Sequence, residues 1–165
     1  MRIQPRKSLI KIESRDWLTN AVIATDTIKA RTVIYQSQEF LILPKPNYQT
    51  VQIADNAHII DHVFANLNHH CSPNTFIDVS DFSLVAERDI EQGEELTFAY
   101  FTTEVKLDRP FYCQCNSSNC IGNILGASQM PFKSLMSYSL SHHVLNLTKF
   151  ASSERYQAYE LGPQH

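Results

Sequence analysis

A chain of 165 residues, with 43% hydrophobic and 19% charged residues, is long enough to bury the core of one globular domain. Its formal net charge of −3 provides no basic surface, so direct binding to nucleic acid is not expected. The sequence holds no apolar run near the roughly 20 residues that a membrane span needs. A secretory signal requires a long apolar stretch after its basic residues, and the basic N-terminus here is not followed by one. We therefore expect an intracellular protein, cytoplasmic or nuclear.

Short alternating and β-branched runs succeed one another through the first hundred residues. Residues 57–66 have no clear period and are compatible with a helical turn. Beyond residue 130, apolar residues recur at roughly helical spacing and predict a C-terminal helix or helix pair. The pattern therefore predicts a mostly-β fold with a helical C-terminal segment. The runs expected to form strands are 8–13, 21–24, the end of 26–35, 40–43, 50–53, 75–79, 82–88 and 93–100.

Two stretches carry most of the polar chemistry. Residues 68–74 read Asn-His-His-Cys-Ser-Pro-Asn, which is too polar for a core segment and too poor in charge for a solvated face. Residues 93–100 read Gly-Glu-Glu-Leu-Thr-Phe-Ala-Tyr, a turn that leads into a strand. In residue type, order and separation these stretches resemble the two signature motifs of the SET domain, N-H-x-C-x-P-N and G-E-E-L-T-x-x-Y.

The chain is thus similar to small stand-alone members of the SET-domain protein-lysine methyltransferase family, over about residues 10 to 126. The resemblance implies a β-clip fold of short twisted sheets with knot-like threading. It also implies a division into a SET domain (1–109), a post-SET zinc segment (110–126) and a C-terminal helical tail (127–165).

All the cysteines of the chain fit one metal site. A tetrahedral structural zinc site takes four soft ligands, and the C-x-C-x4-C spacing after residue 112 resembles the post-SET cluster, whose fourth thiolate lies in the first motif. Two disulfides or four free thiols are the alternatives, although disulfides suit a chain without a secretory signal poorly. The ligands implied by the resemblance are Cys71, Cys113, Cys115 and Cys120. His69 and His70 are not needed as ligands.

The resemblance implies S-adenosylmethionine as the methyl donor. Asn68 and His69 match the pair that holds the donor, and Tyr112 is expected to contact it as well. In the family's opening G-x-G the glycines let the backbone pass close to the donor. Thr19 and Ala21 replace these glycines here. Without the motif, Asn68 would be read as a turn residue and His69 as a core imidazole.

By the same resemblance Tyr100 is the catalytic tyrosine, because a buried phenol stays protonated near neutral pH and is rigid. An ordinary aromatic at a strand end is the alternative role. Phe98 and Phe101 are expected to line the substrate channel. Phe98 falls where the family limits the number of methyl groups added, and phenylalanine there favours di- or trimethylation.

The sequence therefore predicts methyl transfer from S-adenosylmethionine to a lysine ε-amine of a protein or peptide, with a structural zinc ion and without a nucleic-acid or membrane partner. The alternative is a degenerate SET fold that serves as a binding or scaffold module, or whose pocket serves a small-molecule reaction with Tyr100 as general acid. The replaced glycines and Ala99, where the family often has aspartate, favour the alternative.

Overall fold

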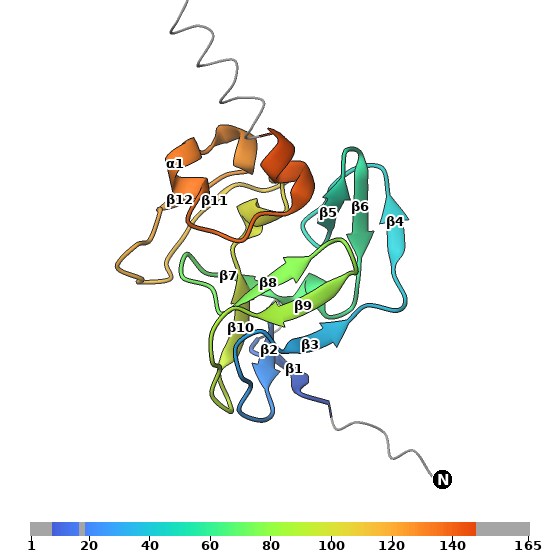
Figure 1. The fold of residues 1–165 in the computed structure, drawn as a ribbon, viewed down its shortest axis with the longest axis vertical. Coiled ribbons are helices and arrows are strands. Elements are labelled where there is room, and N and C mark those ends of the chain that lie inside the picture. The colour runs from blue at the N-terminus through green and yellow to red at the C-terminus, as the bar shows by residue number, and fades with distance from the viewer. Residues whose placement is uncertain (1–7, 17–18, 148–165) are drawn as a thin grey trace, which may run out of the picture.

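The computed structural model describes residues 8–16 and 19–147 (Figure 1). Within these residues the chain is built from short strands, as predicted. They are β1 (Ile10–Ser14), β2 (Asn20–Ala24), β3 (Val33–Gln36), β4 (Leu41–Leu43), β5 (Val51–Ala54), β6 (Ala57–Ile60), β7 (Asn68–His69), β8 (Thr75–Asp78), β9 (Ser83–Ala86), β10 (Glu95–Phe98), β11 (Phe111–Tyr112) and β12 (Asn123–Ile124).

The helical elements are short and gather toward the C-terminal end. They are the 3-10 helices η1 (Phe64–Asn66), η2 (Tyr100–Thr102) and η3 (Ala127–Gln129), the α-helix α1 (Phe132–Leu135) and a helical run at residues 142–147. The predicted mostly-β fold with a helical C-terminal segment is confirmed. In the described part of the chain, none of the helices has the length and apolar character that a membrane span needs.

The strands form four small sheets, in the orders β1-β2-β10-β7, β3-β9-β8, β4-β6-β5 and β11-β12. Almost all pairs are antiparallel, but β10 and β7 run parallel, with Thr97 opposite Asn68 and Phe98 opposite His69. This pairing lays the two sequence motifs side by side. Figure 1 shows the segment from β11 to α1 collected at one end of the molecule, beyond β7.

Two apolar cores follow from this arrangement. The first fills the space between the three larger sheets and includes Val22, Ile59, Leu84 and Leu96, each fully buried. The second joins the C-terminal segment to the first motif, and its buried members are Cys71, Ala99, Phe101, Cys113, Ile124, Ala127, Leu135 and Val144. The chain thus folds back from residue 101 onward onto the outer side of the first motif.

Two expected boundaries differ from the structure. Within residues 57–66, which were compatible with a helical turn, only Phe64–Asn66 form one, η1, whereas residues 57–60 form β6, because their backbone pairs with both β4 and β5. The strand expected to reach Tyr100 ends at Phe98, and Tyr100 begins η2, whose Thr103 N–H closes the turn on Tyr100 O. Ending the strand at Phe98 turns the tyrosine out of the sheet and toward the neighbouring aromatic rings.

Candidate active site and metal centre

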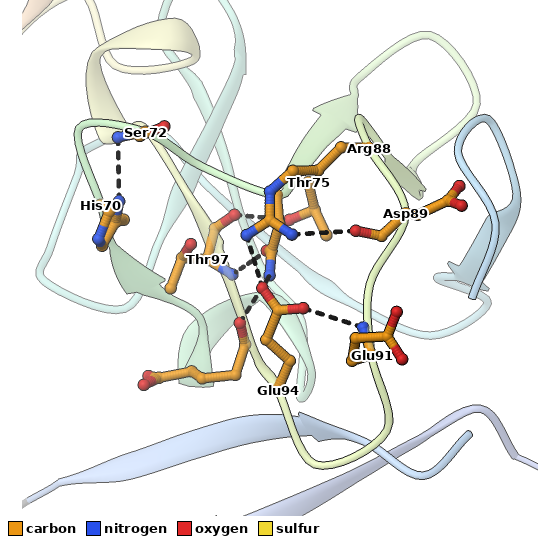
Figure 2. Close-up of polar contacts among 10 residues, drawn as sticks. His70, Ser72, Thr75, Arg88, Asp89, Glu91, Glu94 and Thr97 are labelled. Carbon is orange, nitrogen blue, oxygen red and sulfur yellow. Dashed lines mark hydrogen bonds and ion pairs between the residues drawn. The ribbon is translucent and has the colours of Figure 1, made fainter. Parts of the chain in front are cut away.

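The buried side chain of Asn74 joins the two motifs. Its Oδ1 accepts a hydrogen bond from Thr97 N at 2.9 Å, and its Nδ2 donates to Glu95 O at 2.8 Å. Hydrogen bonds also fix the turn before β10, as Figure 2 shows: the Arg88 guanidinium and the Glu91 N–H both donate to the Glu94 carboxylate. The end of the first motif therefore fixes the strand that carries the second.

Tyr100 lies where the two motifs meet. Its hydroxyl donates to Leu67 O at 2.9 Å, and its backbone N–H donates to His69 Nδ1 at 3.2 Å. Its ring centroid is 5.0 Å from that of Phe98 and 5.9 Å from that of Phe111. Burial raises the pKa of Tyr100 to about 12, so the phenol keeps its proton at neutral pH.

A pocket that opens to solvent lies beside this phenol. Its walls come from the 47–51 and 107–111 segments, with Phe98, Tyr100 and Glu104 among the residues between them. Phe98, an expected channel residue, therefore lines the pocket. Phe101, the other one, does not: its ring is fully buried in the second core and packs on Tyr138 with centroids 4.8 Å apart.

The residues expected to hold the donor fall into two groups. Asn68 and His69 are half-buried in β7, next to Tyr100. The Asn68 Nδ2 donates to Asn20 O and to Glu95 Oε1, whereas its Oδ1 accepts no hydrogen bond from the described residues. This free acceptor suits the ammonium or hydroxyl groups of a polar ligand.

The other expected donor residues lie on other segments of the chain. Thr19 is exposed and closes the turn after β1, accepting from the Arg15 and Asp16 N–H groups. Ala21 is fully buried in β2, so its side chain offers no surface to a ligand. Tyr112 is 71% exposed in β11, beside Phe111. The Asn68 oxygen and the exposed side chains of Thr19 and Tyr112 thus remain available, and they are polar and aromatic groups suited to a ligand such as S-adenosylmethionine.

All four cysteines come together. Their sulfur atoms lie within 4.8 Å of one another, and Cys71 Sγ is 3.8 Å from Cys113 Sγ and 3.9 Å from Cys120 Sγ. A tetrahedron with zinc–sulfur bonds of about 2.3 Å has sulfur–sulfur edges of about 3.8 Å. The donor set and its spacing therefore fit zinc. Burial raises the pKa of the Cys71 thiol, so a bound cation would be needed to keep it as thiolate.

His69 connects the cysteine cluster to the tyrosine. Its Nε2 lies 3.4 Å from Cys71 Sγ, and its Nδ1 accepts from Tyr100 N, so the proton of a neutral ring belongs on Nε2. Burial, followed by the charge of His70, lowers the pKa of His69 to about 4, which keeps the imidazole neutral. The sequence motif had identified His69 only as a neighbour of the donor.

Glu104 is the pocket residue that sequence reasoning missed. It lies four positions after Tyr100, outside both motifs, and is 5% exposed. The sequence offered one signal, an acidic residue that stands alone between the uncharged residues 101–103 and Val105. Its burial was not expected, because acidic residues are almost never buried without a partner.

Comparison with known proteins identifies the class. The SET domain family model matches residues 20–101, about half of the chain. The solved structure of KRYPTONITE in complex with mCHH DNA, H3(1-15) peptide and SAH has the same fold, with a TM-score of 0.53 and 20% identity over 70% of this chain and 29% of that one. The chain belongs to the SET-domain family, as the two motifs predicted, and its cysteines gather as a post-SET cluster requires.

Two known proteins are similar to this chain in sequence. Methyltransferase flvH of Aspergillus flavus is 39% identical over 109 residues, which cover 63% of this chain and 60% of flvH. The H3 lysine-36 specific histone-lysine N-methyltransferase of Aspergillus oryzae is 41% identical over 68 residues, 38% of this chain and 7% of that enzyme. The chain thus spans about 60% of the first relative and a small part of the second.

Proposed function

We propose that this protein transfers a methyl group from S-adenosylmethionine to the ε-amine of a lysine in a protein or peptide. The observation that carries the proposal is the position of Tyr100: its half-buried hydroxyl is protonated and donates to Leu67 O at the wall of a pocket, and its backbone N–H is hydrogen-bonded to His69 of the first motif. Methyltransferases among the relatives, and histone-lysine enzymes among these, support the reaction and the acceptor.

The donor would be held by Asn68, His69, Thr19 and Tyr112, with Ala21 contributing through its backbone at most. When bound, it would supply an activated methyl group: a carbon–nitrogen bond forms to the neutral amine as the carbon–sulfur bond breaks, S-adenosylhomocysteine leaves, and the proton of the resulting ammonium passes to water. The protein's own contribution is to place the amine in line and to exclude water. The SAH in the complex of the structural neighbour supports this choice of donor.

On the acceptor side, Phe98 and Tyr100 would form the narrow end of the channel. Their rings lie 5.0 Å apart between centroids, with Phe98 buried and Tyr100 half-buried. Phe98 has no hydroxyl with which to bind water beside the amine, so we propose that two or three methyl groups can be accommodated. Phe101 would support this wall from the second core.

The cysteine cluster would bind one structural zinc ion. Cys71 lies in the first motif, whereas the other three ligands lie in the 110–126 segment, so the ion would clip that segment onto the SET domain. Tyr138 adds a second tie, because its hydroxyl donates to Cys71 O at 2.7 Å. We propose the division into residues 1–109, 110–126 and 127–165 on this basis, with residues 148–165 of the tail outside the described part.

A small-molecule amine is the second candidate acceptor. The match to flvH extends over 109 residues, compared with 68 for the A. oryzae histone-lysine enzyme, and its name specifies a methyltransferase without an acceptor. A small amine would enter the same pocket and use the same tyrosine. The binding-module alternative predicts that no methyl group is transferred at all.

One labelling experiment separates these possibilities. The protein would be incubated with radiolabelled S-adenosylmethionine and a whole-cell lysate of its source, with recombinant histone H3 as an additional acceptor. Label should appear in protein and be recovered as methyl-lysine after hydrolysis. Label confined to the small-molecule fraction would support the second candidate. No label in either fraction would overturn methyl transfer.

A further inference from the structure

The pocket beside Tyr100 contains a carboxyl group that has no role in the proposed transfer chemistry. Glu104 is 5% exposed and lines the same pocket as Tyr100 and Phe98. A carboxyl group this deeply buried usually has a cationic partner. Among the described residues Glu104 has none.

The contacts of Glu104 use only one of its two oxygen atoms. Oε1 accepts hydrogen bonds from Gln52 N at 2.7 Å and from Thr103 Oγ1 at 3.1 Å. Oε2 accepts none from the described residues. Since an ionised carboxylate can accept about four hydrogen bonds, half of its capacity remains available to a ligand in the pocket.

The position of this carboxyl group is fixed by reciprocal hydrogen bonds. The Gln52 backbone N–H donates to the Glu104 carboxyl, and the Gln52 side-chain oxygen accepts a hydrogen bond from Val105 N at 2.9 Å. These two bonds fix β5 and the 104–105 segment relative to each other. On the other side, Ala127 N donates to Glu104 O. Gly126 permits this approach, because a Cβ there would lie 2.4 Å from Lys106 Cα. Glu104 is therefore held in place before any ligand arrives.

The charged groups at the rim of the pocket already have partners. Arg109 lies 3.7 Å from the Asp108 carboxylate and 4.6 Å above the ring of Tyr48. The charges of Asp108 and Arg109 offset each other, whereas the Glu104 carboxyl has no cationic partner among the described residues. The remaining walls are mostly apolar or aromatic, which strengthens the attraction between Glu104 and a cation inside the pocket.

We propose that Glu104 binds the ammonium group of the substrate amine inside this pocket, through Oε2, and so selects cationic substrates. The inference rests on the proposed function for the identity of the substrate as an amine. It applies equally to a lysine side chain and to a small cationic amine. It assigns recognition to Glu104, whereas Tyr100 remains the group at the reacting atoms.

The protonation of Glu104 agrees with this role. Burial raises its pKa to about 7, and the hydrogen bonds from Gln52 and Thr103 offset only part of this shift. In the empty pocket about half of the carboxyl groups are therefore protonated near neutral pH. A bound cation favours the ionised form, so cation binding should strengthen as pH rises from about 6 to about 8.

The neighbouring titratable groups do not reproduce this pH dependence. Tyr100, with a pKa of about 12, keeps its proton throughout the range. Behind Glu104, His143 lies on Thr103 O, and His58 pairs with Gln52 across β5 and β6. Burial lowers the pKa of both imidazoles, so they are already largely neutral at pH 6.5 and can add to the pH dependence only below that value. Asp108 and Arg109 lie at the rim, where a control variant tests their contribution.

The test compares two blocked amino acids that differ in charge. N-acetyl-lysine amide carries the ammonium, and N-acetyl-norleucine amide replaces it with a methyl group. Calorimetric titration of the full chain should show tighter binding of the lysine probe. Glu104→Gln should weaken lysine-probe binding by at least about tenfold, the usual effect of losing a hydrogen bond to a charged group. Binding of the norleucine probe should not change.

The variant keeps the fold because a glutamine oxygen can still accept from Gln52 N, and thermal unfolding checks this. Asp108→Asn is the matched control, a carboxylate of the same pocket that already has a partner, and should change binding less than about twofold. In the wild type, lysine-probe affinity should increase from pH 6 to pH 8, and in Glu104→Gln it should not. Equal affinity for both probes, no detectable binding of the lysine probe, or a variant that binds like the wild type would overturn the inference.

The readout separates this inference from the proposed function. Probe binding needs no methyl donor, so it tests Glu104 even if no methyl group is ever transferred. Conversely, active methyl transfer with unchanged kinetics in Glu104→Gln would retain the proposed function and remove the role of Glu104.

Discussion

At the scale of single residues, Tyr100 and His69 form one unit. His69 accepts the backbone N–H of Tyr100, packs on its ring with centroids 5.3 Å apart and contacts the Cys71 sulfur, so one side chain lies between the cysteine cluster and the phenol. The motifs gave Tyr100, the cysteines and Asn68 as candidate site residues from sequence alone. They could not show that the imidazole connects them, because that depends on the parallel pairing of β7 with β10.

Replacing Tyr100 with phenylalanine removes the hydroxyl and leaves the ring. We expect methyl transfer to fall by about 10²-fold or more, the usual contribution of a positioned polar group in a transition state. Stability should fall by only about 1 kcal/mol, for one lost hydrogen bond. Tyr138→Phe is the matched control, since it also loses a hydroxyl bonded to a backbone carbonyl but lies outside the pocket. Equal rates for the two variants would argue against a role for the Tyr100 hydroxyl.

The buried carboxyl of Glu104 should make stability depend on pH. Its pKa is raised by burial from 4.5 to about 7. Between these values the folded protein keeps a proton that the unfolded chain releases, so the free energy of unfolding falls as pH rises through this range. Glu104→Gln removes this term, and its stability relative to the wild type should rise by up to about 3 kcal/mol from pH 4.5 to pH 8.

Urea unfolding of both proteins at several pH values provides this difference. His69, with its pKa lowered to about 4, acts in the opposite direction, because it favours the folded state as pH rises toward 6.5. Its effect is common to both proteins and cancels in the comparison. A stability difference that stays constant with pH would mean that Glu104 is not buried as an isolated acid.

At the scale of elements, the strands were largely predictable because each is a short β-branched or alternating run between turn residues. Residues 57–60 were not, since the consecutive residues His58 and Ile59 are both buried, and the run therefore lacks the alternation of a half-exposed strand. The β11–β12 pair was also missed. Two residues in each strand give no periodicity, and the pairing depends on the cysteine cluster between them.

Close approach of two segments at Gly126 gives a prediction at this scale. A Cβ at this position would lie 2.4 Å from both Lys106 Cα and Val105 O, which are backbone atoms, so Gly126→Ala must displace the 104–107 segment. We expect a loss of about 1–3 kcal/mol from overpacking and weaker binding of the lysine probe, because Glu104 and Leu107 line the pocket.

Gly93→Ala is the comparison for this variant. Gly93 has a φ of +85° and nothing within 4 Å of a new Cβ, so alanine there costs backbone strain without moving the pocket. It should lower stability and leave probe binding unchanged. If Gly126→Ala also left probe binding unchanged, the 104–107 segment would not be what positions the pocket.

At the scale of the whole molecule, the cysteine cluster holds the C-terminal segment against the first motif. Metal analysis should find one zinc ion per chain, and a chelator should lower the Tm by at least about 4 °C, which corresponds to about 2 kcal/mol for a domain of this size. Cys113→Ser should already have the lower Tm and respond little to the chelator. A wild-type protein purified without metal, and insensitive to chelation, would contradict the zinc site.

The family could be predicted from two short motifs because their residues meet through backbone pairing, which the motifs themselves encode. The second core could not, since Phe101 was expected in the channel and is instead buried against Tyr138. The pocket itself combines segments around residues 50, 100 and 108. Such long-range assembly leaves no local pattern in the sequence.

The account as a whole depends on donor binding, because Thr19 and Ala21 stand where the family has its glycines. Calorimetric titration with S-adenosylmethionine tests this most directly. We predict a measurable heat with one donor per chain, and a rise in Tm that increases with donor concentration. No heat and no thermal shift at millimolar donor would contradict a methyltransferase and favour a SET fold retained for binding alone.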